Sequence, residues 1–173
     1  MGITIVTVIL VLIVGLLAYA ATRPGAFRVY RSAAIKAPAD KIYPLIDDFH
    51  AWTAWSPYEK LDPDMRKTYE GAANGKGAIY SWEGKKAGAG RMEIADTAAP
   101  NRVTIKLDFS KPFVAHNIAE FTLEPAGEAT TVTWAMSGQT PFMMKVMGLF
   151  MSMDKIVGKD FEAGLASLKA STE

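Results

Sequence analysis

Titratable side chains at mid-strand positions of a predicted sheet are the residues of this sequence best placed for acid–base chemistry. They are Arg91, Glu93 and His116, with Asn117 and Glu120 as further polar positions. Histidine titrates near neutral pH, so His116 could exchange a proton with a substrate. Catalysis requires that these side chains point inward and converge on one reacting atom. A solvated face is the simpler interpretation, because an antiparallel sheet commonly exposes one face to water.

Aromatic and methionine side chains form a second group, suited to binding an apolar ligand. Ligand cavities are mostly apolar and aromatic, with few polar groups, and methionine adapts to irregular shapes because its side chain is unbranched and polarizable. The predicted lining residues are Trp52, Trp55, Tyr80, Trp82, Trp134, Met143, Met147 and Phe150. Ordinary core packing is the alternative for each of them. The methionines would also suit a patch that docks on a membrane or a partner helix.

Composition removes several other kinds of chemistry. The chain has no cysteine, which excludes disulfides, thiol catalysis and cysteine-ligated zinc. Its two histidines lie far apart in the sequence, so no metal site is predicted. The glycine clusters at 71–77 and 84–90 match neither a P-loop nor the dinucleotide fingerprint, so no cofactor is predicted. A net charge of +1 without blocks of like charge gives nucleic-acid binding no electrostatic basis.

A long helix is predicted over Pro141–Lys169, where apolar residues recur at three- and four-residue steps and form one stripe. The methionines widen its first half, so we expect any cavity there, with Ile156–Leu168 as ordinary core. The helix would contain Gly148, Gly158 and Gly164. A glycine inside a helix costs about 1 kcal/mol relative to alanine, so these residues indicate a kink or a close backbone approach.

The chain before this helix predicts an antiparallel sheet. Strand alternation begins at Phe27, a helical turn follows from Ala37, and residues 51–57 give a second short helical turn that Pro57 would stop. The remaining predicted strands are Met65–Glu70, Ala78–Glu83, Arg91–Ala95, Val103–Ser110, Phe113–Leu123 and Thr130–Ser137. A sheet that is apolar on one face must cover it, and the C-terminal helix is the one element long enough. The sequence therefore predicts an α+β fold with a sheet curled around that helix.

An apolar run without charge extends from Ile3 to Ala21. At about 1.5 Å per residue it spans roughly 30 Å, the thickness of a bilayer core. We therefore expect a transmembrane anchor at residues 1–22, a linker at 23–26 and a folded domain at 27–170.

The flanking residues bear on orientation and processing. Arg23, Arg28, Arg31 and Lys36 follow the run, so the positive-inside rule predicts a single-pass protein of the inner or plasma membrane whose domain faces the cytoplasm. A cleaved signal peptide, with a secreted or periplasmic domain, is the alternative, because residues 18–20 have a small-residue cleavage pattern. No basic residue precedes the run, and it is long for a signal peptide.

Several segments resemble one known superfamily. Ala37–Tyr43, Phe49 and Trp52–Pro57 resemble the opening of START-like, SRPBCC-type domains, and Gly90–Ile94 and Gly158–Leu165 are also similar to that group. The resemblance covers about residues 27–170 and extends to members named polyketide cyclase/dehydrase. It implies a helix-grip fold with a cavity between the curled sheet and the last helix, usually for an apolar ligand.

Three functions follow as hypotheses. The first is a membrane-anchored binding or carrier domain for an apolar or amphipathic small molecule, such as a lipid, an isoprenoid or a polyketide-like compound. The second is a cyclase or dehydrase that uses His116, Arg91 or Glu93 inside the cavity. The third is a membrane-associated interaction module with a protein partner.

Overall fold

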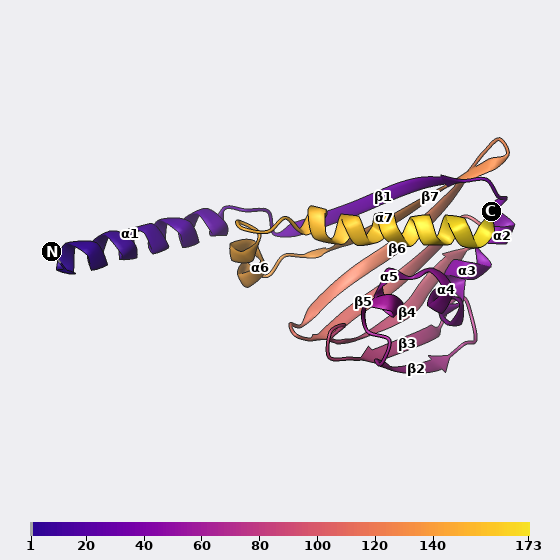
Figure 1. The fold of residues 1–173 in the computed structure, drawn as a ribbon, viewed down its shortest axis with the longest axis horizontal. Helices are drawn as coiled ribbons and strands as arrows, with labels where there is room; N and C mark the ends of the chain where they lie inside the picture. Colours follow the sequence, from indigo (N-terminus) through magenta and orange to yellow (C-terminus); the bar gives the residue numbers. More distant parts are fainter. Residues whose placement is uncertain (1) are drawn as a thin grey trace.

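The computed structural model describes residues 2–173. Its first element is a helix, α1 (Gly2–Ala21), which extends away from one end of a folded domain (Figure 1). Every side chain of α1 except that of Ala20 is at least partly exposed. Within the described residues, α1 is the one helix long and apolar enough to cross a membrane, a test that a signal sequence also passes.

The domain is built on a seven-stranded antiparallel sheet with the order β1-β7-β6-β5-β4-β3-β2. The strands are β1 (Ala26–Ile35), β2 (Arg66–Gly71), β3 (Ala78–Glu83), β4 (Ala89–Ala98), β5 (Arg102–Lys111), β6 (Ala115–Ala126) and β7 (Ala129–Gln139). The sheet curves, and the long C-terminal helix crosses its concave side (Figure 1). Alternate residues of β5, among them Val103 and Ile105, are fully buried. The α+β fold expected from the sequence is confirmed.

Five short helical segments connect β1 to β2. They are α2 (Ala39–Ile42), α3 (Pro44–Asp47), the 3-10 turn η1 (Phe49–Ala51), α4 (Trp52–Trp55) and α5 (Pro57–Leu61). The second predicted helical turn is α4, which ends before Pro57 as expected, but the prediction of two short helices was wrong because Pro57 also opens a further helix, α5. A proline at the first helical position lacks only an N–H that has no intrahelical partner there, so it begins a helix as readily as it ends one.

The predicted continuous helix over Pro141–Lys169 is divided in two. A short helix, α6 (Phe142–Met147), is followed by a turn, and the long helix α7 (Met153–Thr172) starts afresh. Gly148 is the C-cap of α6, and the Ser152 hydroxyl accepts a hydrogen bond from the backbone N–H of Lys155 at 3.4 Å, which caps α7. The apolar period continues across the break, so periodicity alone concealed it.

At Gly158 and Gly164 the backbone of α7 closely approaches neighbouring groups, as predicted. A Cβ at Gly158 would collide with the guanidinium group of Arg31, which bonds the Glu162 carboxylate at 2.7 Å and Asp154 at 3.0 Å. A Cβ at Gly164 would lie 2.7 Å from the ring of Trp134 and 3.0 Å from the ring of Pro57. The helix can therefore lie directly on β7 and α5.

Replacing Gly164 with alanine is expected to destabilise the domain. Overpacking against two rigid rings typically costs about 1–3 kcal/mol, which exceeds the gain of about 1 kcal/mol from helix propensity. Gly158→Ala is the matched control, because the Arg31 guanidinium ends a flexible side chain and can move aside at the cost of its exposed ion pairs, which contribute little. Urea unfolding followed by circular dichroism should therefore show a larger loss for Gly164→Ala. Equal losses would contradict the close-packing explanation.

Candidate ligand-binding site

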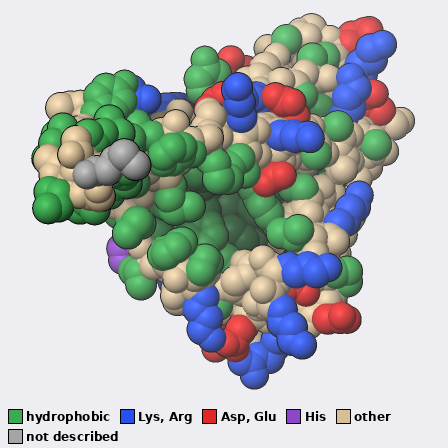
Figure 2. Space-filling view, turned by 60° about the vertical axis from the view of Figure 1, so that its left-hand side comes forward, with side chains coloured by type: hydrophobic (Ala, Val, Ile, Leu, Met, Phe, Trp, Pro, Cys, Tyr) green, Lys and Arg blue, Asp and Glu red, His purple; other side chains and the backbone are tan. Residues whose placement is uncertain are grey.

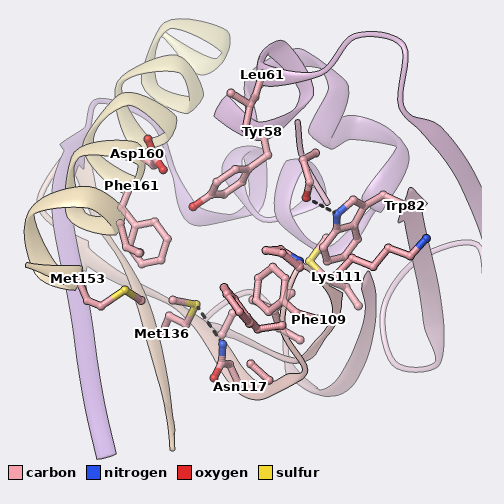
Figure 3. A pocket seen from close by; sticks show the side chains of 18 of the residues that line it. Tyr58, Leu61, Trp82, Phe109, Lys111, Asn117, Met136, Met153, Asp160 and Phe161 are labelled. Atoms are coloured by element: carbon pink, nitrogen blue, oxygen red, sulfur yellow. Dashed lines mark hydrogen bonds between the residues drawn. The ribbon is translucent and has the colours of Figure 1, made fainter. Parts of the chain in front are cut away.

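A cavity of about 730 Å³ lies between the concave face of the sheet, α5 and the first turns of α7. This volume falls in the range of pockets that hold drug-sized ligands. Its lining is mainly apolar and comes from both halves of the chain, including Trp52, Met92, Leu107, Phe109, Ala119, Met136, Met153 and Val157. Figure 3 shows side chains of the sheet and of α7 facing one another across it.

Aromatic rings form much of the wall on the sheet side. Trp82 lies between Tyr80 and Phe109, with ring centroids 6.0 Å and 5.7 Å away. The Trp82 indole N–H donates a hydrogen bond to the carbonyl oxygen of Ala87 at 3.1 Å, which fixes the ring against the β3–β4 loop (Figure 3). The wall is therefore apolar and held in one orientation.

Five of the eight predicted lining residues lie on the cavity. They are Trp52, Tyr80, Trp82, Trp134 and Met143. The other three are elsewhere: Trp55 is fully buried in the core, where its indole N–H donates to the carbonyl of Leu45 at 2.7 Å. Met147 and Phe150 belong to α6 and the following turn, where they are exposed and outside the lining. The cavity thus adjoins the methionine-rich segment at Met143 and Met153.

Two polar atoms beside the cavity have no hydrogen-bond partner in residues 2–173. They are the side-chain oxygen of Asn117 and the indole N–H of Trp134, both buried. The Asn117 side chain lies over Gly138, whose missing Cβ leaves room for it, and next to Met136 (Figure 3). Buried polar groups are nearly always hydrogen-bonded, so these two atoms are exceptions. The Asn117 oxygen lies against Gly138, and the Asn117 amide nitrogen faces Met136 of the cavity lining.

Titratable groups that the sequence did not single out also border the cavity. Tyr58 on α5 and Asp160 on α7 both point into it (Figure 3). Burial raises the pKa of Asp160, and burial with the nearby Asp160 charge raises the pKa of Tyr58. Glu59 bonds Lys67 and accepts a hydrogen bond from the Tyr80 hydroxyl at 2.8 Å. Asp160 lies three residues after Val157 and therefore on the apolar stripe of the helix. A carboxylate on that stripe is the sequence signal from which its place at the cavity could have been predicted.

The three residues predicted for acid–base chemistry lie together on the outer face of the sheet. Arg91 bonds Glu93 at 2.8 Å, and His116 bonds Asp108 at 2.6 Å. Strand register places Arg91 opposite Asp108, and Asp108 opposite His116. Neighbouring residues such as Met92 and Asn117 face the cavity instead. A ligand in the cavity is therefore separated from this outer cluster by the sheet.

The loop between β3 and β4, which carries Lys86 and Ala87 of the lining, is held by Asp62. The Asp62 carboxylate accepts hydrogen bonds from the backbone N–H of Lys86 at 2.7 Å and of Ala87 at 3.2 Å. These bonds hold the pKa of Asp62 below its ordinary value.

Asp62→Asn is therefore expected to lower the melting temperature at neutral pH. A carboxylate whose folded-state pKa is depressed stabilises the fold above its unfolded-state pKa of about 4, and this contribution is lost as pH falls through the folded-state pKa. The difference in melting temperature between wild type and variant should consequently shrink below about pH 4. Thermal unfolding at neutral and acidic pH measures it. A constant difference would contradict the role of the charge.

The mouth of the cavity is bordered by exposed apolar side chains: Leu61, Phe113, Val114 and Met143. In Figure 2 the end of the domain from which α1 extends faces the reader, and a hollow surrounded by hydrophobic side chains opens there. The cavity thus opens toward the side on which α1 lies.

A curved antiparallel sheet, a long C-terminal helix and an apolar cavity between them define the helix-grip fold. The chain belongs to the family described as polyketide cyclase / dehydrase and lipid transport, whose sequence profile matches residues 26–173. The expected superfamily is thereby confirmed. No curated protein sequence matches the chain significantly.

Solved structures share the fold at low sequence identity. Protein CV1439 from Chromobacterium violaceum is 15% identical, with a TM-score of 0.60 over 87% of this chain and 99% of its own. Major latex-like protein 151 from Panax ginseng is 13% identical, with a TM-score of 0.59 over 86% and 99%. DynU16, a protein of the dynemicin biosynthetic locus, is 16% identical, with a TM-score of 0.58 over 83% of this chain and 46% of its own.

Proposed function

We propose that this protein is a membrane-anchored binding or carrier domain for an amphipathic small molecule of lipid, isoprenoid or polyketide-like character. The observation that carries the proposal is the apolar cavity of about 730 Å³ with its open mouth. A ligand there would exchange water for aromatic and methionine side chains, which favours binding by roughly 25 cal/mol for each Å² of apolar surface buried. The family's description, which includes lipid transport, supports the same function.

The polar groups of the cavity favour an amphipathic ligand over a pure hydrocarbon. The Asn117 amide nitrogen, which faces Met136, and the Trp134 indole N–H would both donate hydrogen bonds to the ligand. Lys86 and Lys111 lie among the lining residues and could pair with an acidic group. An apolar body with one polar end satisfies both kinds of surface.

Helix α1 would serve as the membrane anchor. It is uncharged, and its final turn carries Tyr19, whose ring lies 5.4 Å from the guanidinium carbon of Arg23. Tyrosine and arginine at a helix end are typical of the boundary between hydrocarbon and water. With Arg23, Arg28, Arg31 and Lys36 following the helix, the domain would face the cytoplasm.

Ligand binding is tested by purifying the full-length protein from its membrane in a mild detergent, washing it extensively, and analysing the extracted organic phase by mass spectrometry. A stoichiometric amphipathic compound, absent from a detergent-purified membrane protein without such a domain, is the expected result. Intrinsic tryptophan fluorescence offers a second measurement, because Trp52, Trp82 and Trp134 all line the cavity. A brominated fatty acid should quench them saturably. If no compound co-purifies and the fatty acid does not quench the tryptophans, the proposal is overturned.

Anchoring is tested by fractionating cells that produce the full chain or a chain lacking residues 1–22. The full chain should remain in the membrane after a carbonate wash at its uncleaved mass, and the shortened chain should be in the cytosol. A shortened, exported product of the full chain would instead establish a signal peptide.

A further inference from the structure

We propose that the mouth of the cavity docks on the same bilayer that holds α1, with the β5–β6 loop and α6 inserted among the lipid headgroups. The ligand then passes between cavity and leaflet without crossing bulk water. This inference rests on the proposed anchoring by α1, but it assigns a further surface to the membrane. We call this surface the docking rim and define it as Phe113, Val114, Phe142, Met143, Phe150 and Met151.

The docking rim exposes more apolar surface than a soluble domain normally leaves in water. Val114 is 66% exposed, Met143 60% and Phe150 74%. Contiguous exposed apolar side chains mark an interaction site with a protein, a ligand or a membrane. Phe113, Val114 and Met143 belong to the cavity lining as well as to the surface, so the apolar surface continues from the cavity to the outside.

The position of the rim relative to α1 identifies its partner as the lipid surface. The backbone N–H of Thr140 donates a hydrogen bond to the carbonyl oxygen of Gly25 at 2.9 Å, and Ala26 pairs with Gln139. The chain therefore enters β1 directly beside the point where it leaves β7 for α6. Helices α1 and α6 also contact each other.

The linker is too short to hold the rim away from a bilayer. Residues 22–25 separate the end of α1 from the start of β1. At about 3.5 Å per extended residue they span at most roughly 14 Å, about twice the depth of the headgroup layer on one side, so the start of β1 stays within about 10 Å of the lipid surface. Figure 1 shows α6 at the end of the domain from which α1 departs, and Figure 2 shows the hydrophobic side chains gathered on that face.

Charge around the rim is compatible with an anionic leaflet. Lys145 lies on α6, and Lys86 and Lys111 border the cavity. Lys111 is paired with Glu83 at 2.8 Å, so Lys86 and Lys145 are the better sites for headgroup phosphates. Basic residues beside an anionic membrane contribute about 1 kcal/mol each.

Single-cysteine labelling of the full chain tests the docking directly, because the protein has no native cysteine. Variants Phe142→Cys and Phe150→Cys carry an environment-sensitive NBD fluorophore on the rim. Neither residue lines the cavity, so their signal reports the bilayer and not a bound ligand. Glu128→Cys, in the turn between β6 and β7 at the far end of the domain, is the matched control. Ile9→Cys in α1 reports anchoring.

Each labelled protein is reconstituted at a large excess of lipid into vesicles of phosphatidylcholine and phosphatidylglycerol, with or without a lipid carrying a doxyl quencher near its headgroup. We expect a blue-shifted emission and several-fold doxyl quenching at positions 142 and 150, with a water-like, unquenched emission at position 128. A strongly blue-shifted emission at position 9 with unquenched labels at 142 and 150 would overturn docking while leaving the anchor intact. A water-like emission at position 9 would overturn the anchor itself.

A protein partner or a second copy on the rim would give a different result. The emission at positions 142 and 150 would be blue-shifted but insensitive to the doxyl lipid, which would overturn membrane docking. Phe142→Asp together with Phe150→Asp, neither of which lines the cavity, should slow transfer of a fluorescent fatty acid from vesicles into the cavity several-fold. Tyr30→Asp, at an exposed aromatic residue on β1, is the control and should leave transfer unchanged. Equal transfer in both variants would also overturn the proposal.

Discussion

Ala119→Trp is expected to weaken ligand binding strongly while the domain stays folded. Ala119 lies in β6, is 4% exposed and lines the cavity. An indole side chain at this position would project into the space that a ligand occupies, and the open cavity accommodates it without displacing packed core atoms. Loss of the contacts along one wall should weaken binding at least about tenfold, equivalent to roughly 1.4 kcal/mol.

The neighbouring substitution Ile118→Trp is the matched control. Ile118 is on the same strand but on the outer face, 41% exposed and outside the lining. Both variants add a large side chain to adjacent positions of β6, so any general effect on the strand is common to them. Co-purified ligand measured by mass spectrometry should be lost only from Ala119→Trp. Retention of ligand by that variant would place the binding site elsewhere.

Trp134→Ala should destabilise the domain by about 3–5 kcal/mol, the usual cost of removing a buried large aromatic ring. Trp134 stacks on Phe161 of α7 with ring centroids 4.1 Å apart, and on Phe121 of β6 at 5.0 Å. The Trp134 ring therefore packs α7 against the middle of the sheet, and its loss would extend the cavity into the core. Urea unfolding followed by far-ultraviolet circular dichroism measures the change.

Two further substitutions separate packing from polarity at this position. Trp134→Phe keeps an aromatic ring and removes the unpaired indole N–H, so its loss should be much smaller than that of the alanine variant. Trp82→Ala removes a partly buried ring on β3 and should also cost less. If Trp82→Ala were as damaging as Trp134→Ala, the helix–sheet contact would not be the main support of the fold.

The sheet was predictable because one of its faces is buried. Val103, Ile105 and Leu107 alternate with polar residues, and the structure places all three inside. β3 has the bounds predicted for it, Ala78–Glu83. The division between α6 and α7 was not predicted, since the apolar period survives across the turn and only local capping by Gly148 and Ser152 ends one helix and begins the next.

The cavity was harder to predict than the fold because a single residue decides which face a strand position occupies. His116 and Asn117 are neighbours on β6, and the structure places only Asn117 on the cavity. Ile118 is apolar yet on the outer face, so hydrophobicity did not fix the orientation of this strand. Tyr58 and Asp160 come from separate helices, and only the folded chain brings them to one cavity.

The edge strand β2 affects whether copies of the chain can associate through their sheets. It is six residues long, and its Arg66 and Lys67 side chains pair with Glu83 and Glu59. Short edge strands with charged side chains resist the addition of a strand from another molecule. If α1 anchors the protein as proposed, its copies meet at high local concentration in the plane of the membrane, and the charged side chains of β2 would keep neighbouring sheets from pairing at this edge.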